Sequence, residues 1–234
     1  SWLCSSRPYR GRVGGQRDVS HKSDEYAFHP PADAPPARLV MLVTWSLFMG
    51  YAALVTLQHR LKDEYDMIPH PQSSTAFTYA SQVNYIGNLI FRLAHNFVFA
   101  CLTPRGRVHL SLGAMVLAAS ILGGAICIGR SPWIGWVTLA YFIGGVSVGT
   151  FESNLLTCLT PLGHATKKWA ILGMPLGFTT ISVFGFLLLL AGAPLVSLYT
   201  LVAAGCITSM VVFARCVPRG DDGGDNGDGG GGTR

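Results

Sequence analysis

Two side chains of opposite charge, Arg92 and Glu152, stand inside long apolar stretches of this sequence. Glu152 is the only aspartate or glutamate between Met67 and Gly220. A charged side chain at the centre of a bilayer costs about 2.5 to 3.5 kcal/mol to insert, so a lone acid there is neutral, paired or turned toward water. Since Arg92 is the one basic residue at a comparable depth, we expect the two side chains to form a buried ion pair.

A polar stripe surrounds Arg92. Its members recur every four residues, which places them on one helix face, and they are Asn84, Asn88, Arg92 and Asn96, with His95 beside the last. We hypothesise that this stripe and Glu152 line a polar cavity in which a substrate or a proton is handled. The alternative is structural: an ion pair that locks two helices together and a histidine that hydrogen-bonds between helices.

The composition is that of a membrane protein. Half of the 234 residues are hydrophobic and only 12% are charged, against about 25% charged in ordinary soluble domains. The net charge of +5 could indicate a nucleic-acid partner, but the basic residues flank apolar stretches and so indicate membrane topology instead. We therefore expect a lipid bilayer, and no nucleic acid, as the partner of this chain.

Hydrophobic runs of the length that a helix needs to cross a bilayer divide the chain. We predict an all-α, polytopic bundle within residues 38–216, with six transmembrane helices at about 39–57, 77–102, 110–128, 133–159, 169–190 and 195–213. A mixed-charge loop is expected after the first, from His59 to Asp66. Residues 1–37 are predicted to be a disordered basic arm, and the Gly- and Asp-rich residues 217–234 a disordered tail.

Lysine and arginine predict the orientation of these helices. They gather before the first predicted span and after the second, fourth and sixth, whereas acids outnumber them after the first. By the positive-inside rule both termini are then cytoplasmic. An even number of spans requires the same arrangement, so the two arguments agree.

Glycine pairs predict where helices pack closely. Gly145 and Gly149 in the fourth span, and Gly173 and Gly177 in the fifth, have the small-xxx-small spacing that lets two helix backbones approach. The alternative is that they reflect only the high glycine content of membrane helices. Glu152 follows Gly145 by seven residues, so it should face protein. Pro175, between the second pair, predicts a kink or hinge.

Soluble-type catalytic chemistry is not indicated. The sequence has no GxGxxG, Walker, HExxH or GxSxG motif, and its six cysteines are scattered without a CxxC. We therefore expect no enzyme, no metal site and no cofactor.

The predicted layout resembles one half of a major facilitator superfamily transporter. The turn after the second span matches the end of that family's Gly-x-x-x-Asp-Arg-x-Gly-Arg motif at Gly106-Arg107, with Thr103 at the position of the acid. The stretches at 79–84, 103–108 and 160–173 are similar in style to the equilibrative nucleoside transporter branch. The resemblance implies that the first, second, fourth and fifth helices line a substrate cavity, and that a second six-helix half or a second copy completes the pathway.

Together these features predict secondary transport of a small polar or anionic solute by alternating access. Arg92 would bind the anion or hold the salt bridge, Glu152 would couple or gate, and the asparagines would hydrogen-bond the solute. The alternative is a membrane scaffold or assembly subunit whose polar side chains only join helices.

Overall fold

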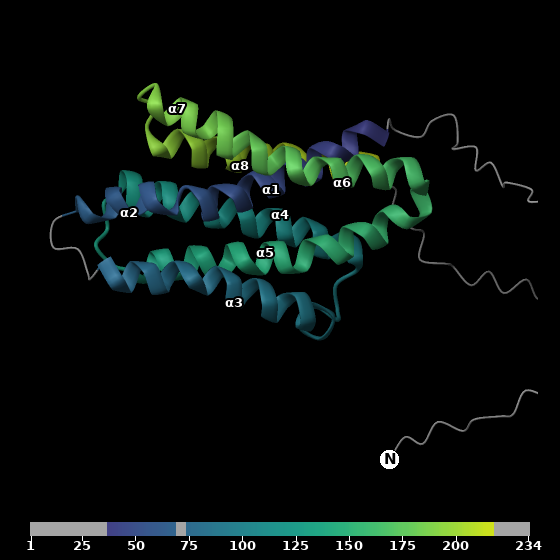
Figure 1. Cartoon of the computed structure of the whole chain (residues 1–234). Helices are drawn as coiled ribbons and strands as arrows, with labels where there is room; N and C mark the ends of the chain where they lie inside the picture. The colour runs from purple at the N-terminus through teal and green to yellow at the C-terminus, as the bar shows by residue number, and fades with distance from the viewer. Residues whose placement is uncertain (1–36, 69–73, 218–234) are drawn as a thin grey trace, which may run out of the picture.

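The computed structural model describes residues 37–68 and 74–217, and within these ranges the chain contains only helices and turns (Figure 1). Six helical segments follow one another: α1 (Val40–Thr56) with α2 (Gln58–Asp66); α3 (Ser74–Val98); α4 (Pro104–Ile121) with the π-helix η2 (Leu122–Ile128); α5 (Gly135–Leu159); α6 (Gly163–Thr179), the π-helix η4 (Thr180–Gly185) and α7 (Phe186–Leu190); and α8 (Leu195–Cys216). The predicted arm and tail fall, except for Ala37 and Val217, outside the described residues.

The all-α prediction is confirmed, and part of the chain is apolar enough for a membrane. Among the described residues, three helices have the length and hydropathy of a membrane span: Pro104–Ile128, Gly163–Leu190 and Leu195–Cys216. The bent pair of α1 and α2 would make a fourth. Helices α3 and α5 have 25 residues each, enough to cross a bilayer at about 1.5 Å per residue, but they are not among the helices with that hydropathy.

The loop predicted at His59 to Asp66 is wrong, because these residues form α2, which is bent by 52° from α1. Leu61 and Tyr65, four residues apart, lie on one face of α2 and are fully buried, while the charged residues take the other face. The Tyr65 hydroxyl donates a hydrogen bond of 2.5 Å to the Pro132 carbonyl. An amphipathic pattern this short is easily missed among so many charges.

Helices α4 and α6 begin more than a turn before their predicted spans, because their first turns are basic and resemble loops in the sequence. Helix α4 begins at Pro104, where proline suits the first helical position. The Thr103 hydroxyl caps it by accepting a hydrogen bond from the Gly106 N–H. Helix α6 begins at Gly163, whose φ of 85° is a conformation that glycine adopts readily.

The helices lie alongside one another in a repeated pattern. Helix α1 packs against α6 and α8, α5 packs against α3 and α4, and α4 packs against α8 (Figure 1). The first three helical segments correspond in order to the last three: α1 to α5, α3 to α6 and α4 to α8. When each segment is replaced by its counterpart, the same pairs of neighbouring helices result. Helices α3 and α6 therefore take equivalent positions at opposite edges of the bundle.

Both edge helices are joined to the bundle through glycine. A Cβ on Gly149 of α5 would lie 2.5 Å from the Asn88 carbonyl oxygen of α3. A Cβ on Gly177 of α6 would lie 2.5 Å from the Trp45 carbonyl oxygen of α1. Helix α6 continues through Pro175, and its irregular stretch, the π-helix η4, begins only at Thr180.

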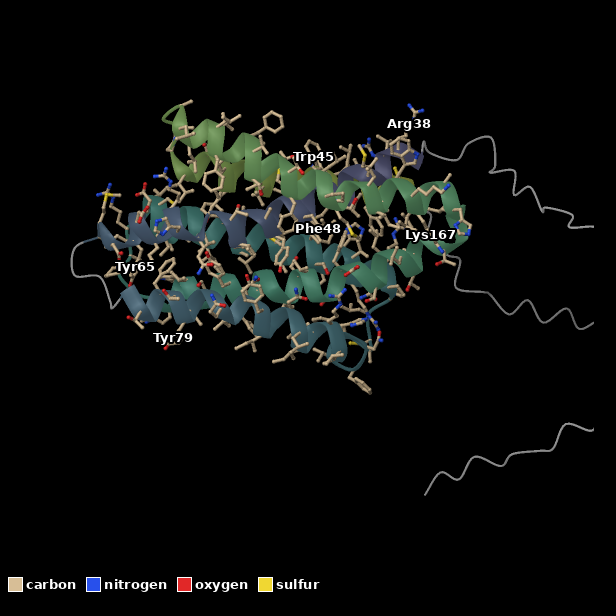
Figure 2. All side chains as sticks on the ribbon, viewed as in Figure 1. Arg38, Trp45, Phe48, Tyr65, Tyr79 and Lys167 are labelled. Atoms are coloured by element: carbon tan, nitrogen blue, oxygen red, sulfur yellow. The ribbon has the colours of Figure 1, made fainter. Side chains whose placement is uncertain are left out.

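Small polar side chains join the central helices. The Ser147 hydroxyl of α5 donates to the Ser111 carbonyl of α4 at 2.6 Å, and the Ser209 hydroxyl of α8 donates to the Leu42 carbonyl of α1 at 3.0 Å. Such bonds between helices are typical where lipid supplies no hydrophobic driving force. The basic side chains Arg38 and Lys167 gather at one end of the bundle, and Tyr65 lies at the other (Figure 2).

Candidate functional site

Helices α3 and α5 position the candidate site. They run in the same direction, because Gly145 lies against Asn84 and Gly149 lies against Asn88 and the Arg92 backbone. This close contact extends toward the ends of both helices and brings the side chain of Arg92 beside that of Glu152. The two glycines of α5 thus fix the register in which the charged residues meet.

The expected pair forms, but at the surface of the chain. The Arg92 Nη2 donates to Glu152 Oε2 at 2.5 Å. The Arg92 side chain is 60% exposed and that of Glu152 is 37% exposed, so the expectation of a buried pair is wrong for this chain. The physical reason is that Arg92 lies on the flank of α3, beside the contact with α5 rather than within it.

A tyrosine of α1 extends this open flank. The Tyr51 side chain interacts with the Asn88 side chain and lies near Tyr85 and Arg92. Its ring also packs edge-on against Phe178 of α6, with the ring centroids 5.6 Å apart. Polar groups from α1, α3 and α5 therefore share one face of the bundle. We call Tyr51, Tyr85, Asn88, Arg92 and Glu152 the polar flank.

The rest of the predicted stripe lies elsewhere. Asn84 is buried between α3 and α5, and its Oδ1 has no hydrogen-bond partner among the described residues. His95 is buried, with its Nδ1 at the backbone carbonyls of Phe91 and Arg92 and its Nε2 3.2 Å from the Ser153 hydroxyl. His95 therefore joins α3 to α5, whereas Asn84 is only enclosed between them.

Asn96 belongs to a second polar group, built around Arg107 of α4. The buried Arg107 guanidinium donates to Asn96 Oδ1 at 2.6 Å and to Asn154 Oδ1 at 3.4 Å. Its Nε also donates to the Phe99 and Leu102 carbonyls, each at 3.0 Å, just beyond the end of α3. This group holds α3, α4 and α5 together at one end of the bundle.

Three of these residues were missed in the sequence. From the sequence, Tyr51 belongs only to an apolar span, Arg107 belongs to a basic turn and to the Gly106-Arg107 match, and Asn154 has no predicted role. Asn154 had a usable signal, because it is an amide two residues after Glu152 in an otherwise apolar helix. Tyr51 had none, because its contact with Asn88 exists only once the helices have assembled into the bundle.

Comparison of the chain with protein-family models, with curated proteins and with solved structures finds no match. Within the described ranges no group of three or more histidine, cysteine, aspartate or glutamate residues could hold a metal ion. The side chains of the polar flank offer a guanidinium, a carboxylate, an amide and phenolic hydroxyls.

Proposed function

We propose that this chain is a six-helix half of a facilitator-like secondary transporter, and that it moves a small polar or anionic solute by alternating access. In this proposal all six helical segments cross the bilayer and both termini are cytoplasmic. The solute passes along the polar flank, and a second copy or a second six-helix half covers it from the other side.

The packing supports six crossings. Helix α4 has the length and hydropathy of a span, and α5 lies along it. Helix α3 in turn lies along α5, with glycine contacts at successive turns. Helices that pack side by side over such lengths occupy the same layer, so we infer that α3 and α5 lie in the membrane with α4.

The repeated set of neighbours supports the facilitator-like arrangement. Each half of such a transporter is built from two three-helix repeats of inverted topology. Exchanging the first three segments of this chain with the last three keeps the same neighbours. The basic side chains at one end of the bundle (Figure 2) support a cytoplasmic location for that end.

One observation carries the functional part of the proposal. The side chains of the Arg92–Glu152 pair are 60% and 37% exposed, and they lie on two helices that we place in the bilayer. Charged groups exposed to hydrocarbon are strongly unfavourable, so such a pair must face water or another protein surface. Water or a polar surface at this depth is what a solute pathway requires.

A scaffold or assembly subunit is the second candidate, and a specific observation favours it. The Arg107 group and the His95–Ser153 contact join helices to one another without reaching the open flank. If a permanent partner protein covered the Arg92–Glu152 pair, this pair would also serve only to join helices. Transport and scaffolding therefore differ in whether water reaches the pair.

Thiol labelling of reconstituted protein separates these candidates. In a cysteine-free background, Arg92→Cys and Glu152→Cys should react with a membrane-impermeant thiol reagent from one side of the vesicle if the flank lines a pathway. Ile90→Cys is the matched control, because Ile90 is 47% exposed but lies about 160° around α3 from Arg92, facing lipid. Protection of both site cysteines would support a scaffold and contradict transport.

A further inference from the structure

The Arg92–Glu152 pair occupies few of the N–H donors of the arginine. Contact is through one atom of each side chain, Nη2 and Oε2. A guanidinium carries five N–H donors in a planar fork that fits two oxygens of one anion. Within the described ranges no other acceptor bonds Arg92, and its side chain is 60% exposed. Most of its donors are therefore open to a ligand.

Glu152 is the acid that competes for this arginine. The helices packed against α5 carry these titratable groups: Tyr51 on α1; Tyr79, Tyr85, Arg92 and His95 on α3; Arg105, Arg107 and His109 on α4; Cys127 on η2; and His164, Lys167 and Lys168 on α6. Among the described residues only Arg92 pairs with Glu152. His95, the titratable residue nearest to Arg92 along α3, is hydrogen-bonded to Ser153.

We propose that a small carboxylate monoanion binds the Arg92 fork in exchange for Glu152, and that Glu152 takes up one proton when it leaves. The inference rests on the proposed function and names the solute class of that same site. Tyr51 interacts with Asn88 and, through its charge, with Arg92, so the polar flank offers a hydroxyl and an amide as further hydrogen-bonding groups for the anion.

The exchange conserves charge. Before binding, the Glu152 carboxylate and the Arg92 guanidinium sum to zero. One proton from bulk water adds to Glu152 and one monoanion adds to Arg92, so the loaded site also sums to zero. No unpaired charge is left in the bilayer in either state, which favours movement of both states through the transport cycle. The anion and the proton therefore travel together in a one-to-one ratio.

Benzoate and its neutral isostere benzamide test this exchange in the full chain reconstituted in lipid nanodiscs. Calorimetry in buffers of different ionisation enthalpy should show about one proton taken up per benzoate bound. Benzoate affinity should then fall about tenfold per pH unit once Glu152 is ionised. Benzamide should bind at least tenfold more weakly than benzoate at low pH.

Glu152→Gln mimics the protonated acid and should bind benzoate without proton uptake and without pH dependence. Glu64→Gln, which removes an acid of α2 outside the flank, should behave like the unaltered protein. If Glu152→Gln does not fold, the double variant Arg92→Gln/Glu152→Gln removes both charges. That variant should fold and bind neither benzoate nor benzamide.

Three results would overturn the exchange: benzoate binding without proton uptake in the unaltered protein, equal binding of benzamide, or no binding of benzoate at any pH. Uptake of a neutral solute by proteoliposomes together with any of these would leave the proposed transport standing. Protection of the cysteines at positions 92 and 152 from water would remove the transport proposal itself.

Discussion

Arg107 is a buried cation that the described structure balances with carbonyl groups instead of a carboxylate. Its Nε lies 3.0 Å from the carbonyls of Phe99 and Leu102, where α3 has just ended. The C-terminal end of a helix carries a partial negative charge and unsatisfied carbonyl groups. A guanidinium placed there is stabilised both by this charge and by hydrogen bonds to the carbonyl groups. Arg107 thereby closes the turn between α3 and α4.

Arg107→Gln should lower the free energy of unfolding by about 2 kcal/mol, because it removes the donor to the buried Asn154 amide oxygen and to the Leu102 carbonyl. Denaturant titration in mixed micelles measures this change. Arg215→Gln is the matched control, since Arg215 is exposed on α8, and it should change stability by less than about 0.5 kcal/mol. Equal stability of the two variants would contradict the role given to Arg107.

Exchanging the charges of the site separates structure from function. Glu152→Arg alone places two like charges together and should destabilise the fold, while Arg92→Glu/Glu152→Arg should restore expression because an opposite pair can form again. Benzoate binding should not return, because the guanidinium now extends from α5 instead of α3. Recovery of both expression and binding would show that the position of the arginine is unimportant.

The ion pair was predictable from the sequence, but its surroundings were only partly so. One acid and one base at similar depths leave few alternatives in an apolar medium. The four-residue spacing placed Asn84 and Asn96 on the same helix face as Arg92, but side chains on one face still differ in their angle around the helix axis. Small differences in angle decide whether an amide meets a neighbouring helix, a buried arginine or open space.

Among the helices, the glycine contacts make a further prediction. Gly177→Ala should push α6 away from α1, because its Cβ would lie 2.5 Å from the Trp45 carbonyl oxygen. We expect a loss of about 1 to 3 kcal/mol in the free energy of unfolding. Gly113→Ala on α4 is the control, since its Cβ meets no atom within 4 Å, and stability should stay equal or rise slightly. A neutral Gly177→Ala would mean that α6 does not pack closely on α1.

Helix existence was easier to predict than helix ends. Long apolar runs specify the six helical segments, whereas the starts of α4 and α6 depend on a threonine cap and on a glycine with positive φ. Helix α2 depends on its buried face, Leu61 and Tyr65, which only the packed bundle creates. Local polarity therefore misled the sequence interpretation wherever tertiary contacts stabilised a basic or charged helical turn.

For the whole molecule, the sequence could give the number of helical segments but not their neighbours. Nothing in the hydropathy of α3 shows that it packs on α5 and lies at the edge of the bundle. The pairing depends on matched glycines and on the short connections, which act only once the helices are close together. The exposed face of α3, with Leu89, Leu93 and Phe97, is then left for lipid or a second half.

Sidedness of the connections tests the six crossings, and above all those of α3 and α5. Single cysteines in a cysteine-free chain are labelled from each side of intact vesicles at Glu64, Arg105, Arg130, Lys167, Gly192 and Arg215. We predict that positions 64, 130 and 192 react on one side and positions 105, 167 and 215 on the other. If 64 and 105, or 130 and 167, react on the same side, α3 or α5 does not cross the membrane and the proposed pathway cannot exist.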